Sequence, residues 1–533
     1  MKAENVPGTP TYKSYSIRYE SVWHNNAQIV ADEDTNKFYV ALYSTVFLYD
    51  RTIRPMLPDL PSQMLRRFGV EVRGEDLRYE EEWERRWRYV SEAIDRMGTV
   101  QLRMFDRWGN RVDELLYPPE YWDMLYAGYR AGVVGRVFRE NSLKPFYVLG
   151  YITSFYDPGV YCPYTVSIST ALPLYKYGSK DLKERYLPNL IATEGEIWQG
   201  ATWMTEAKGG SDLGNTVETI AEPSENGVWI LNGEKYFASN VGAEVAVVAA
   251  RIKGRPKGVR SLALFLLPKY RRDGSLNYLV RRIKPKIGTR SVPTGEVELR
   301  NSEAYLLGRP EWGIYLILEA LNVSRVANSV GSVALAHRSW VEAMNFAKRR
   351  WAFGRYINDH PLLKRQFEDV AREVEEAFVL AWESVEALDG VYLEKPKYSK
   401  AYHTFRLIAH MSKYWTAEVS VKAAKWSMEV HGGMGVLEEY PAERLLREAM
   451  ILPIWEGTAH RQVLDGVEAI VKKDAHVGLY ERFKDYAGAE EIRRLGEEIK
   501  AMDDLRRERE ADLLFKGMID ATLKVLRERY SLT

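Results

Sequence analysis

The spacing of apolar residues changes twice along the chain and divides it into three stretches. From about residue 36 to residue 195 the spacing is mostly helical. Trp83, Trp87 and Val90, for example, follow one another at intervals of four and three residues, so they share one face of a helix. Large side chains on one face are typical of a helix that packs against a core. We expect a loop at Phe155–Pro163, where two prolines and one glycine interrupt the pattern.

Near Glu196 the apolar period shortens from 3.6 residues toward two, which is typical of strands. Short runs rich in Val, Leu and aromatic residues follow, and Gly, Asn or Pro separates them. The Asn232-Gly233 pair favours a tight hairpin turn. We therefore expect a β domain of about 100 residues. Its predicted strands are Val228–Leu231, Lys235–Ala238, Glu244–Arg251, Ser261–Pro268 and Gly295–Leu299.

Helical spacing returns at Trp312. The segment Trp312–Gly354 contains no proline, and a helix through most of it would be roughly 60 Å long at 1.5 Å per residue. Such a helix suits a bundle, with one face in the core and another in an oligomer interface. Residues 390–399 predict a helix–helix connection, and residues 490–530 predict a charged helix or two. We therefore expect four regions: 1–195, mostly helical; 196–308, β; 309–474, a helical bundle; and 475–533, a helical tail.

Composition and charge exclude several classes of protein. The 533 residues include 75 Lys and Arg against 74 Asp and Glu, so the formal net charge of +1 argues against a dedicated nucleic-acid coat protein. The single cysteine, Cys162, excludes an intrachain disulfide and a C-x-x-C redox pair and fits a reducing cytoplasm. No apolar run approaches the roughly 20 residues that a transmembrane helix needs. We expect a soluble, cytoplasmic protein with no membrane partner.

Two segments of the β region can bind a ligand. Residues 205–212 contain paired glycines followed by Ser211, an arrangement that lets backbone N–H groups approach an anion, although an ordinary turn has the same composition. The segment matches neither a P-loop nor a dinucleotide-binding fingerprint. Phe237 and Ser239 point to the same face of a strand. That pair can stack on and hydrogen-bond to a flat heterocycle, or simply pack in the core.

Two helical segments offer further candidates. The cations of Arg349–Arg355 suit either a helix C-terminus, with Gly354 as its stop, or a cofactor pyrophosphate. Residues 431–435 form a glycine-rich turn. Glu456 follows in an apolar and aromatic run between Pro453 and Gly457. Burial there would raise the pKa of Glu456 and make it a stronger base, whereas the alternative is an ordinary acid near a helix start.

These segments, in this order, resemble the acyl-CoA dehydrogenase family over roughly residues 150–470. The longer N-terminal region and the Cys162-Pro163 pair look similar to its AidB-like branch. The resemblance implies an α+β fold with an N-terminal helical domain, a middle β-barrel or sandwich domain, a C-terminal four-helix bundle and, here, an extra helical tail. It also implies FAD as cofactor and a homotetramer.

The resemblance assigns roles residue by residue, with no metal site. Glu456 matches the catalytic base. Substrate contacts match Ser211, Arg325 and Gly457. Flavin contacts match Met204, Thr205, Gly210, Ser211, Phe237, Ser239, Arg350, Phe353, Glu429, Gly433, Trp455, Thr458 and His460, of which Arg350 and Phe353 would hold the adenine end of FAD from a neighbouring subunit.

Several positions depart from the family pattern. Phe237 replaces a common Trp, Ser239 a common Thr, and Trp455 the usual Tyr. Glu429 stands where many members have Gln, which puts an acid near the adenosine diphosphate. Two further exchanges are His460 for the common Gln or Asn and Asn322 for the Asp of short- and medium-chain enzymes.

The implied reaction is α,β-dehydrogenation of an acyl-CoA thioester, as in fatty acid metabolism. Glu456 would remove the α-proton, FAD would take the β-hydride, and an electron-transfer flavoprotein or similar acceptor would reoxidise the flavin. The alternative is an AidB-like flavoprotein that binds DNA in the response to alkylation damage. Residues 490–530 carry ten Lys and Arg against eleven Asp and Glu, a balance that argues against nucleic-acid binding through this tail.

Overall fold

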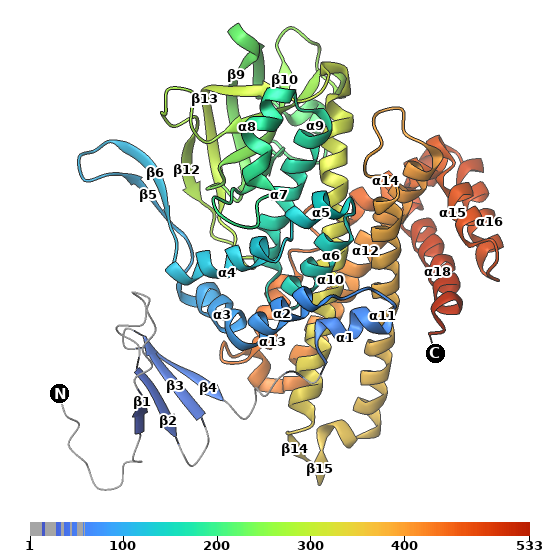
Figure 1. The fold of residues 1–533 in the computed structure, drawn as a ribbon. Helices are drawn as coiled ribbons and strands as arrows, with labels where there is room; N and C mark the ends of the chain where they lie inside the picture. Colours follow the sequence, from blue (N-terminus) through green and yellow to red (C-terminus); the bar gives the residue numbers. More distant parts are fainter. Residues whose placement is uncertain are drawn as a thin grey trace.

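The structure is a computed structural model that describes residue 57, residues 59–532 and the backbone of four strands nearer the N-terminus (Figure 1). Those strands form an antiparallel sheet in sequence order: β1 (Lys13–Tyr15), β2 (Gln28–Asp32), β3 (Lys37–Leu42) and β4 (Thr45–Asp50). The expectation of helix from residue 36 is therefore wrong for β3 and β4. Both runs are rich in Val, Phe and Tyr, which favour strands over helices.

Helices then dominate up to residue 190 and are interrupted in the sequence by one β-hairpin. Trp83 and Trp87 are buried, as the apolar stripe predicted. The elements are α1 (Pro61–Arg67), α2 (Gly74–Glu82), the π-helix η2 (Trp83–Trp87), α3 (Arg88–Met97), β5 (Gln101–Phe105), β6 (Arg111–Leu116), α4 (Pro119–Arg130), α5 (Gly135–Glu140), α6 (Lys144–Tyr156), α7 (Pro158–Tyr177) and α8 (Lys180–Leu190).

The loop expected at Phe155–Pro163 is not present. Only Asp157 separates α6 from α7, and its carboxylate accepts a hydrogen bond from the Val160 backbone N–H. Pro158 occupies the first position of α7, where a missing N–H costs nothing. Asp157 and Pro158 therefore begin a helix, and the prolines and glycine in this segment indicated a boundary between two helices rather than a loop.

The middle of the chain folds into one closed sheet. Its strands follow the order β11-β10-β8-β9-β13-β12, β7 pairs with β10, and a further pairing of β11 with β13 closes the sheet into a barrel. The strands are β7 (Gly200–Trp203), β8 (Ile220–Pro223), β9 (Val228–Ser239), β10 (Val245–Ile252), β11 (Leu262–Pro268), β12 (Leu279–Ile283) and β13 (Thr294–Leu306).

The hairpin expected at Asn232-Gly233 is wrong, because β9 continues through both residues. Gly233 serves a close approach instead: a Cβ there would lie 2.4 Å from the Thr219 Oγ1 atom. A glycine inside a strand often marks such a contact. The pairing of β9 with β13 shifts register on this stretch.

Long helices build the C-terminal bundle and lie side by side in Figure 1. The predicted connection at residues 390–399 separates α11 from α12. The charged tail is helical as predicted and packs on α11, α12 and α14, where Arg527 pairs with Glu376 at 2.7 Å. The helices are α10 (Gly313–Ala347), α11 (Pro361–Asp389), α12 (Lys400–His431), α13 (Pro441–Ala449), α14 (Ala459–Lys473), α15 (Ala475–Phe483), α16 (Ala489–Ala501), α17 (Asp504–Arg509) and α18 (Ala511–Tyr530).

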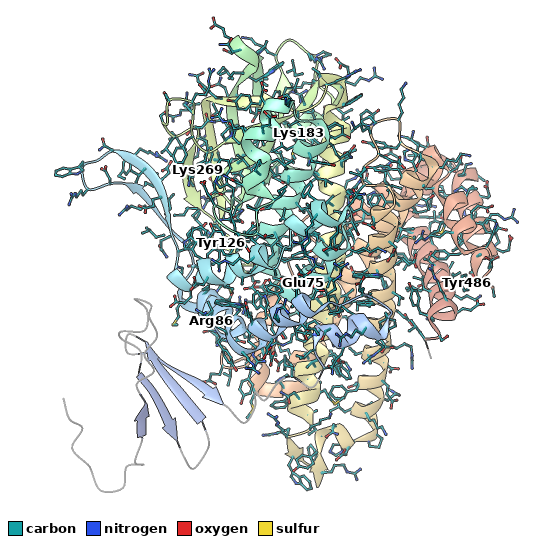
Figure 2. The ribbon with its side chains drawn as sticks, viewed as in Figure 1. Glu75, Arg86, Tyr126, Lys183, Lys269 and Tyr486 are labelled. Atoms are coloured by element: carbon teal, nitrogen blue, oxygen red, sulfur yellow. The ribbon has the colours of Figure 1, made fainter. Side chains whose placement is uncertain are left out.

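Helix α7 joins the barrel to the bundle. The Thr170 hydroxyl donates to the Ala201 carbonyl of β7 at 2.7 Å, and the Ser169 hydroxyl lies 3.1 Å from that of Ser324 on α10. Figure 2 draws the side chains that fill this region, with Lys269 labelled on the barrel and Tyr486 in the tail. Among the described helices, none is both long and apolar enough to cross a lipid bilayer.

Candidate functional site

Glu456 lies in a strained turn between α13 and α14. Its φ is 57° and that of Gly457 is 96°, so two successive residues adopt left-handed backbone. Glycine tolerates this conformation, whereas a glutamate there is strained. A side chain at Gly457 would be strained by this backbone conformation and would also displace the Gln462 amide, since a Cβ would lie 2.7 Å from its Nε2 atom. The sequence therefore places a strained carboxylate at a fixed position.

The Glu456 carboxylate is suited to accept a proton. Its Oε2 atom is buried and has no hydrogen-bond partner in the structure. Burial raises the pKa of Glu456 to about 7, although the positive charges of Arg325 and Lys413 act to lower it. The direction agrees with the expectation from its apolar surroundings. A carboxylate with a pKa near neutrality and a free oxygen can act as a general base.

Polar side chains from α12 and α14 hold the backbone of this turn. The Lys413 Nζ atom donates to the carbonyls of Pro453 and Gly457, and the Gln462 side-chain amide donates to those of Glu456 and Gly457. Sequence reasoning missed both residues. A lysine on the inward face of a predicted bundle helix was the available signal, because such a charge is rarely buried without a purpose.

Trp455 connects the turn to the rest of the molecule. Its indole N–H donates to the Asn328 side-chain oxygen on α10. Its ring packs against Cys162 and Val166 of α7 and against Val292, which precedes β13. Helix α7, the barrel and the turn therefore meet at one apolar cluster directly beside Glu456.

The face of the barrel near this cluster carries the predicted Phe237 and Ser239. The Phe237 ring is 52% exposed, and the Ser239 hydroxyl lies 3.3 Å from that of Thr294. The Lys286 Nζ atom donates to the same Thr294 hydroxyl at 3.1 Å. Burial raises the pKa of Cys162 to about 12, a shift that Lys286 opposes and Glu456 reinforces. Cys162 thus lies within electrostatic reach of both the barrel and the turn.

The loop at residues 204–211 leads out of β7. Met204 is buried, Thr205 is partly buried and Ser211 is exposed. Gly210 packs against Thr205 so closely that a Cβ would lie 2.4 Å from the Thr205 Oγ1 atom. Glu206 anchors the loop through an ion pair with the buried Lys235 at 2.7 Å. The loop is therefore held firmly at its base and presents its Gly-Gly-Ser end to solvent.

Arg325 lies inside the bundle on α10. One of its terminal nitrogens donates to the Asn322 side-chain oxygen, and its Nε atom is buried without a hydrogen-bond partner. Burial lowers the pKa of Arg325, while Asp465 and Glu456 act to raise it. The guanidinium therefore faces the Glu456 turn as a buried positive charge.

Thr458 and His460 also lie beside the Glu456 turn, whereas four other predicted flavin contacts do not. Thr458 is the N-cap of α14 and His460 is in its first turn, and both are exposed. The four distant residues belong to what we call the hairpin end, residues 348–356 together with 429–433. Along α10, Arg325 and Ala347 are roughly 33 Å apart at 1.5 Å per residue, so one chain cannot bring these residues to Glu456. They are Arg350, Phe353, Glu429 and Gly433.

The hairpin end is exposed. Helix α10 stops at Ala347, and β14 (Trp351–Ala352) pairs with β15 (Arg355–Tyr356). Gly354, expected to stop the helix, lies in the turn of this hairpin with a φ of 81°. The Phe353 ring is 95% exposed. Phe346 and His431, whose ring centroids are 4.4 Å apart, hold the ends of α10 and α12 together.

The described residues contain no group of three or more His, Cys, Asp or Glu side chains arranged to hold a metal ion. The site brings together one carboxylate, two buried cations and an exposed aromatic side chain on the barrel. Such a set can accept a proton and bind a flat or anionic ligand.

Comparison with known sequences gives three domain matches. Residues 92–196 match the adaptive response protein AidB N-terminal domain, residues 201–302 the acyl-CoA dehydrogenase middle domain, and residues 311–470 the acyl-CoA dehydrogenase C-terminal domain. Acyl-CoA dehydrogenase family member 11 of Caenorhabditis elegans is 28% identical over 80% of this chain and 70% of its own. The putative acyl-CoA dehydrogenase AidB of Escherichia coli is 28% identical over 78% of this chain and 79% of its own.

Solved structures share the fold. The apo form of Bd2924 has a TM-score of 0.79 and 27% identity, covering 89% of this chain and 96% of its own. Caenorhabditis elegans ACDH-11 in complex with C11-CoA has a TM-score of 0.77 and 23% identity, covering 89% of this chain and 88% of its own. The arrangement of helical, barrel and bundle regions is therefore common to these proteins.

Proposed function

The chain belongs to the acyl-CoA dehydrogenase family, and we propose that it oxidises an acyl-CoA thioester at the α,β bond with Glu456 as the base. It is a flavin-dependent oxidoreductase, as its family is, and its AidB-type N-terminal domain supports placement in the AidB-like branch. One observation carries the assignment of the base. The Glu456 Oε2 atom is buried and unpaired, on a strained turn beside the barrel.

The residues at the barrel face fit FAD. Gly210 allows the loop to fold closely onto the Thr205 side chain, and the loop presents the exposed Ser211 hydroxyl to a ligand. Phe237 offers an exposed ring on the same strand face as Ser239. We propose that Met204, Thr205, Gly210, Ser211, Phe237, Ser239, Trp455, Thr458 and His460 contact the flavin within one chain. FAD, when bound, accepts the hydride from the substrate β-carbon.

The protein residues supply proton transfer, positioning and exclusion of water. We propose that the Glu456 backbone N–H donates to the thioester carbonyl, which acidifies the α-proton, and that the Glu456 carboxylate takes this proton. Arg325 and Lys413 keep positive charge near the carboxylate, so its pKa stays near neutrality despite burial. Trp455, Cys162 and Val292 close an apolar wall that keeps water out of the site.

The remaining parts of the assignment concern partners. We propose a homotetramer in which Arg350, Phe353, Glu429 and Gly433 hold the adenine end of FAD in a neighbouring subunit, because they lie far from Glu456 in their own chain. Arg325 and Gly457 would contact the acyl-CoA together with Ser211. An electron-transfer flavoprotein or similar acceptor would reoxidise the flavin. The boundaries near residues 195, 308 and 474 remain our proposal for the domain limits.

The test is an anaerobic titration of the flavin-loaded protein with a panel of acyl-CoA esters, in which the visible absorbance of the flavin is monitored. We expect at least one acyl-CoA to bleach the flavin absorbance. If none does, the dehydrogenase assignment fails. Salt-dependent binding of duplex DNA by the same preparation, without any bleaching, would instead support the DNA-associated alternative.

A further inference from the structure

Lys413 is a buried amine whose contacts all converge on the backbone of the Glu456 turn. We propose that Lys413 is a positioning residue for the reaction: it fixes the turn that carries Glu456 and thereby aims the carboxylate at the substrate α-carbon. This inference rests on the proposed function, since it concerns how the proposed base is held.

The contacts of Lys413 bracket Glu456 in the chain. Its Nζ atom donates to the Pro453 carbonyl at 2.9 Å and to the Gly457 carbonyl at 2.7 Å. One carbonyl lies three residues before Glu456 and the other directly after it. An ammonium group has three donors, so one side chain can close both ends of this turn. The left-handed backbone of Glu456 and Gly457 is strained and persists only where surrounding contacts fix it.

Lys235 and Lys176, two other buried lysines, combine main-chain carbonyls with a carboxylate partner, whereas Lys413 bonds carbonyls without one. Lys235 contacts the Glu206 carboxylate at 2.7 Å, and Lys176 contacts that of Glu319 at 2.5 Å. Lys413 is 0% exposed, yet within the described part of the chain both of its hydrogen bonds go to main-chain carbonyls. A carboxylate is the usual partner of a buried lysine, because the opposite charge offsets part of the desolvation cost. The geometry therefore points to the turn itself as the purpose of this side chain.

Gln462 forms a second clamp on the same turn. Its amide nitrogen donates to the carbonyls of Glu456 and Gly457 at 3.0 and 2.9 Å. Its amide oxygen lies 2.9 Å from the His410 Nδ1 atom. His410 and Lys413 are three residues apart on one face of α12. This face therefore supports the turn directly through Lys413 and indirectly through the contact of His410 with Gln462. A rigid helix thus controls the position of a turn from another part of the chain.

The charges around Glu456 come from several elements. Arg325 of α10 and Lys413 of α12 both favour the ionised carboxylate, and the Cys162 thiol of α7 lies within electrostatic reach. On α14, Asp465 acts on Arg325 and on His410. Burial lowers the pKa of Lys413 to about 7, so the amine is fully charged only below that pH, where its loss would remove one of the two favourable charges. The carboxylate would then bind its proton more tightly, and its pKa would rise.

The experiment compares Lys413→Met with Lys422→Met, a matched change on the exposed face of the same helix, where Lys422 pairs with Glu373. Both flavin-loaded proteins are mixed anaerobically with an acyl-CoA that bleaches the wild-type flavin. The rates of flavin reduction and of α-proton exchange in D2O are measured across pH.

For Lys413→Met we expect a normal flavin spectrum, a substrate dissociation constant within about threefold of wild type, and both rates lower by about 100-fold, the loss expected for a misplacement of about 1 Å. We also expect the acid limb of the pH profile to move to higher pH. Lys422→Met should match wild type in every measurement. A merely structural loss would lower the rates without moving the acid limb.

Wild-type rates and an unshifted acid limb in Lys413→Met would overturn the inference. If Lys413→Met does not fold, Gln462→Met takes its place; we then expect slower proton exchange, by about tenfold, with normal flavin binding, and wild-type exchange would overturn the clamp mechanism. A wild-type protein that shows neither bleaching nor α-proton exchange would remove the proposed function as well. Bleaching in wild type with no effect in the variants would remove only the role of Lys413.

Discussion

The two ends of α10 present opposite kinds of site. Near Arg325, the Glu456 turn is enclosed by α7, the barrel, α12 and α14, and side chains from three of these elements contact it. At the hairpin end, the Phe353 ring is 95% exposed and the neighbouring arginines lie in solvent. The first site is enclosed by several elements of one chain. Among the described residues, the second presents its cations and aromatic rings to solvent, and its ring contacts are local ones such as Trp351–Tyr356 and Phe353–His360.

The difference in burial between the two sites suits them to different tasks, proton transfer at the Glu456 turn and cofactor binding at the hairpin end. A base needs a fixed position and a controlled pKa, which burial and clamping provide. A contact for the distant end of a long cofactor needs reach and exposed charge, and a projecting hairpin provides both. If this division is right, substitutions at the Glu456 turn will change rates, and substitutions at the hairpin end will change cofactor affinity.

The largest effect is expected for Glu456→Gln. The amide cannot accept the α-proton, so flavin reduction by acyl-CoA should slow by roughly 10²–10⁴-fold. FAD binding should persist because the barrel face is untouched. Stopped-flow absorbance and the flavin content of the purified variant measure the two quantities. Full residual activity would remove Glu456 as the base.

The pH dependence of the wild-type reaction is the next largest effect. Glu456 must be ionised to act as a base, and its pKa is raised to about 7. The rate of flavin reduction should therefore be constant well above pH 7 and fall about tenfold per unit well below it. A profile that stays flat down to pH 5 would show that the carboxylate is not desolvated during the reaction.

A smaller change is expected when Phe353 is replaced by Ala at the hairpin end. The ring is almost fully exposed, so the free energy of unfolding should change by less than about 0.5 kcal/mol. The dissociation constant of FAD should rise by about tenfold, equivalent to about 1.4 kcal/mol. Thermal melting of the apoprotein and fluorescence titration with FAD measure these values. Unchanged affinity would break the proposed role of the hairpin end.

The smallest effect is expected for Glu429→Gln. The Glu429 carboxylate is exposed and pairs with Lys425 at 2.6 Å, and such surface pairs contribute about 0.3–0.5 kcal/mol. Removing a negative charge from the proposed neighbourhood of the adenosine diphosphate should tighten FAD binding by a few-fold, and more at low salt than at high salt. Lys397→Gln, a charge change in the loop before α12 at the opposite end of that helix, is the control and should leave FAD affinity unchanged.

Much of the architecture could be predicted from the sequence because helices and strands bury apolar residues at different periods. The bundle, the tail and the connection at residues 390–399 follow from that pattern. The errors arose at local signals: Asn232-Gly233 favours a hairpin in isolation, yet β9 uses the glycine for close contact with Thr219. Tertiary packing overrode the turn preference there.

The candidate site was only partly accessible to sequence reasoning. The surroundings of Glu456 predicted a raised pKa, because the residue lies in an apolar and aromatic run where a carboxylate would be desolvated. Lys413 and Gln462 could not be found in the same way, since their role depends on α12 and α14 both facing one turn. A lysine on the inward face of a predicted helix indicates burial, but the sequence around it does not show which distant segment it contacts.

The position of Cys162 allows its thiol to report when the contact between α7, the barrel and Trp455 opens. The thiol is buried where α7, the barrel and Trp455 meet, and its pKa of about 12 leaves almost no thiolate at neutral pH. A sulfhydryl reagent can then modify the chain only when these three parts separate. The rate of labelling at Cys162 consequently measures how often the contact between α7, the barrel and Trp455 opens, without any engineered probe.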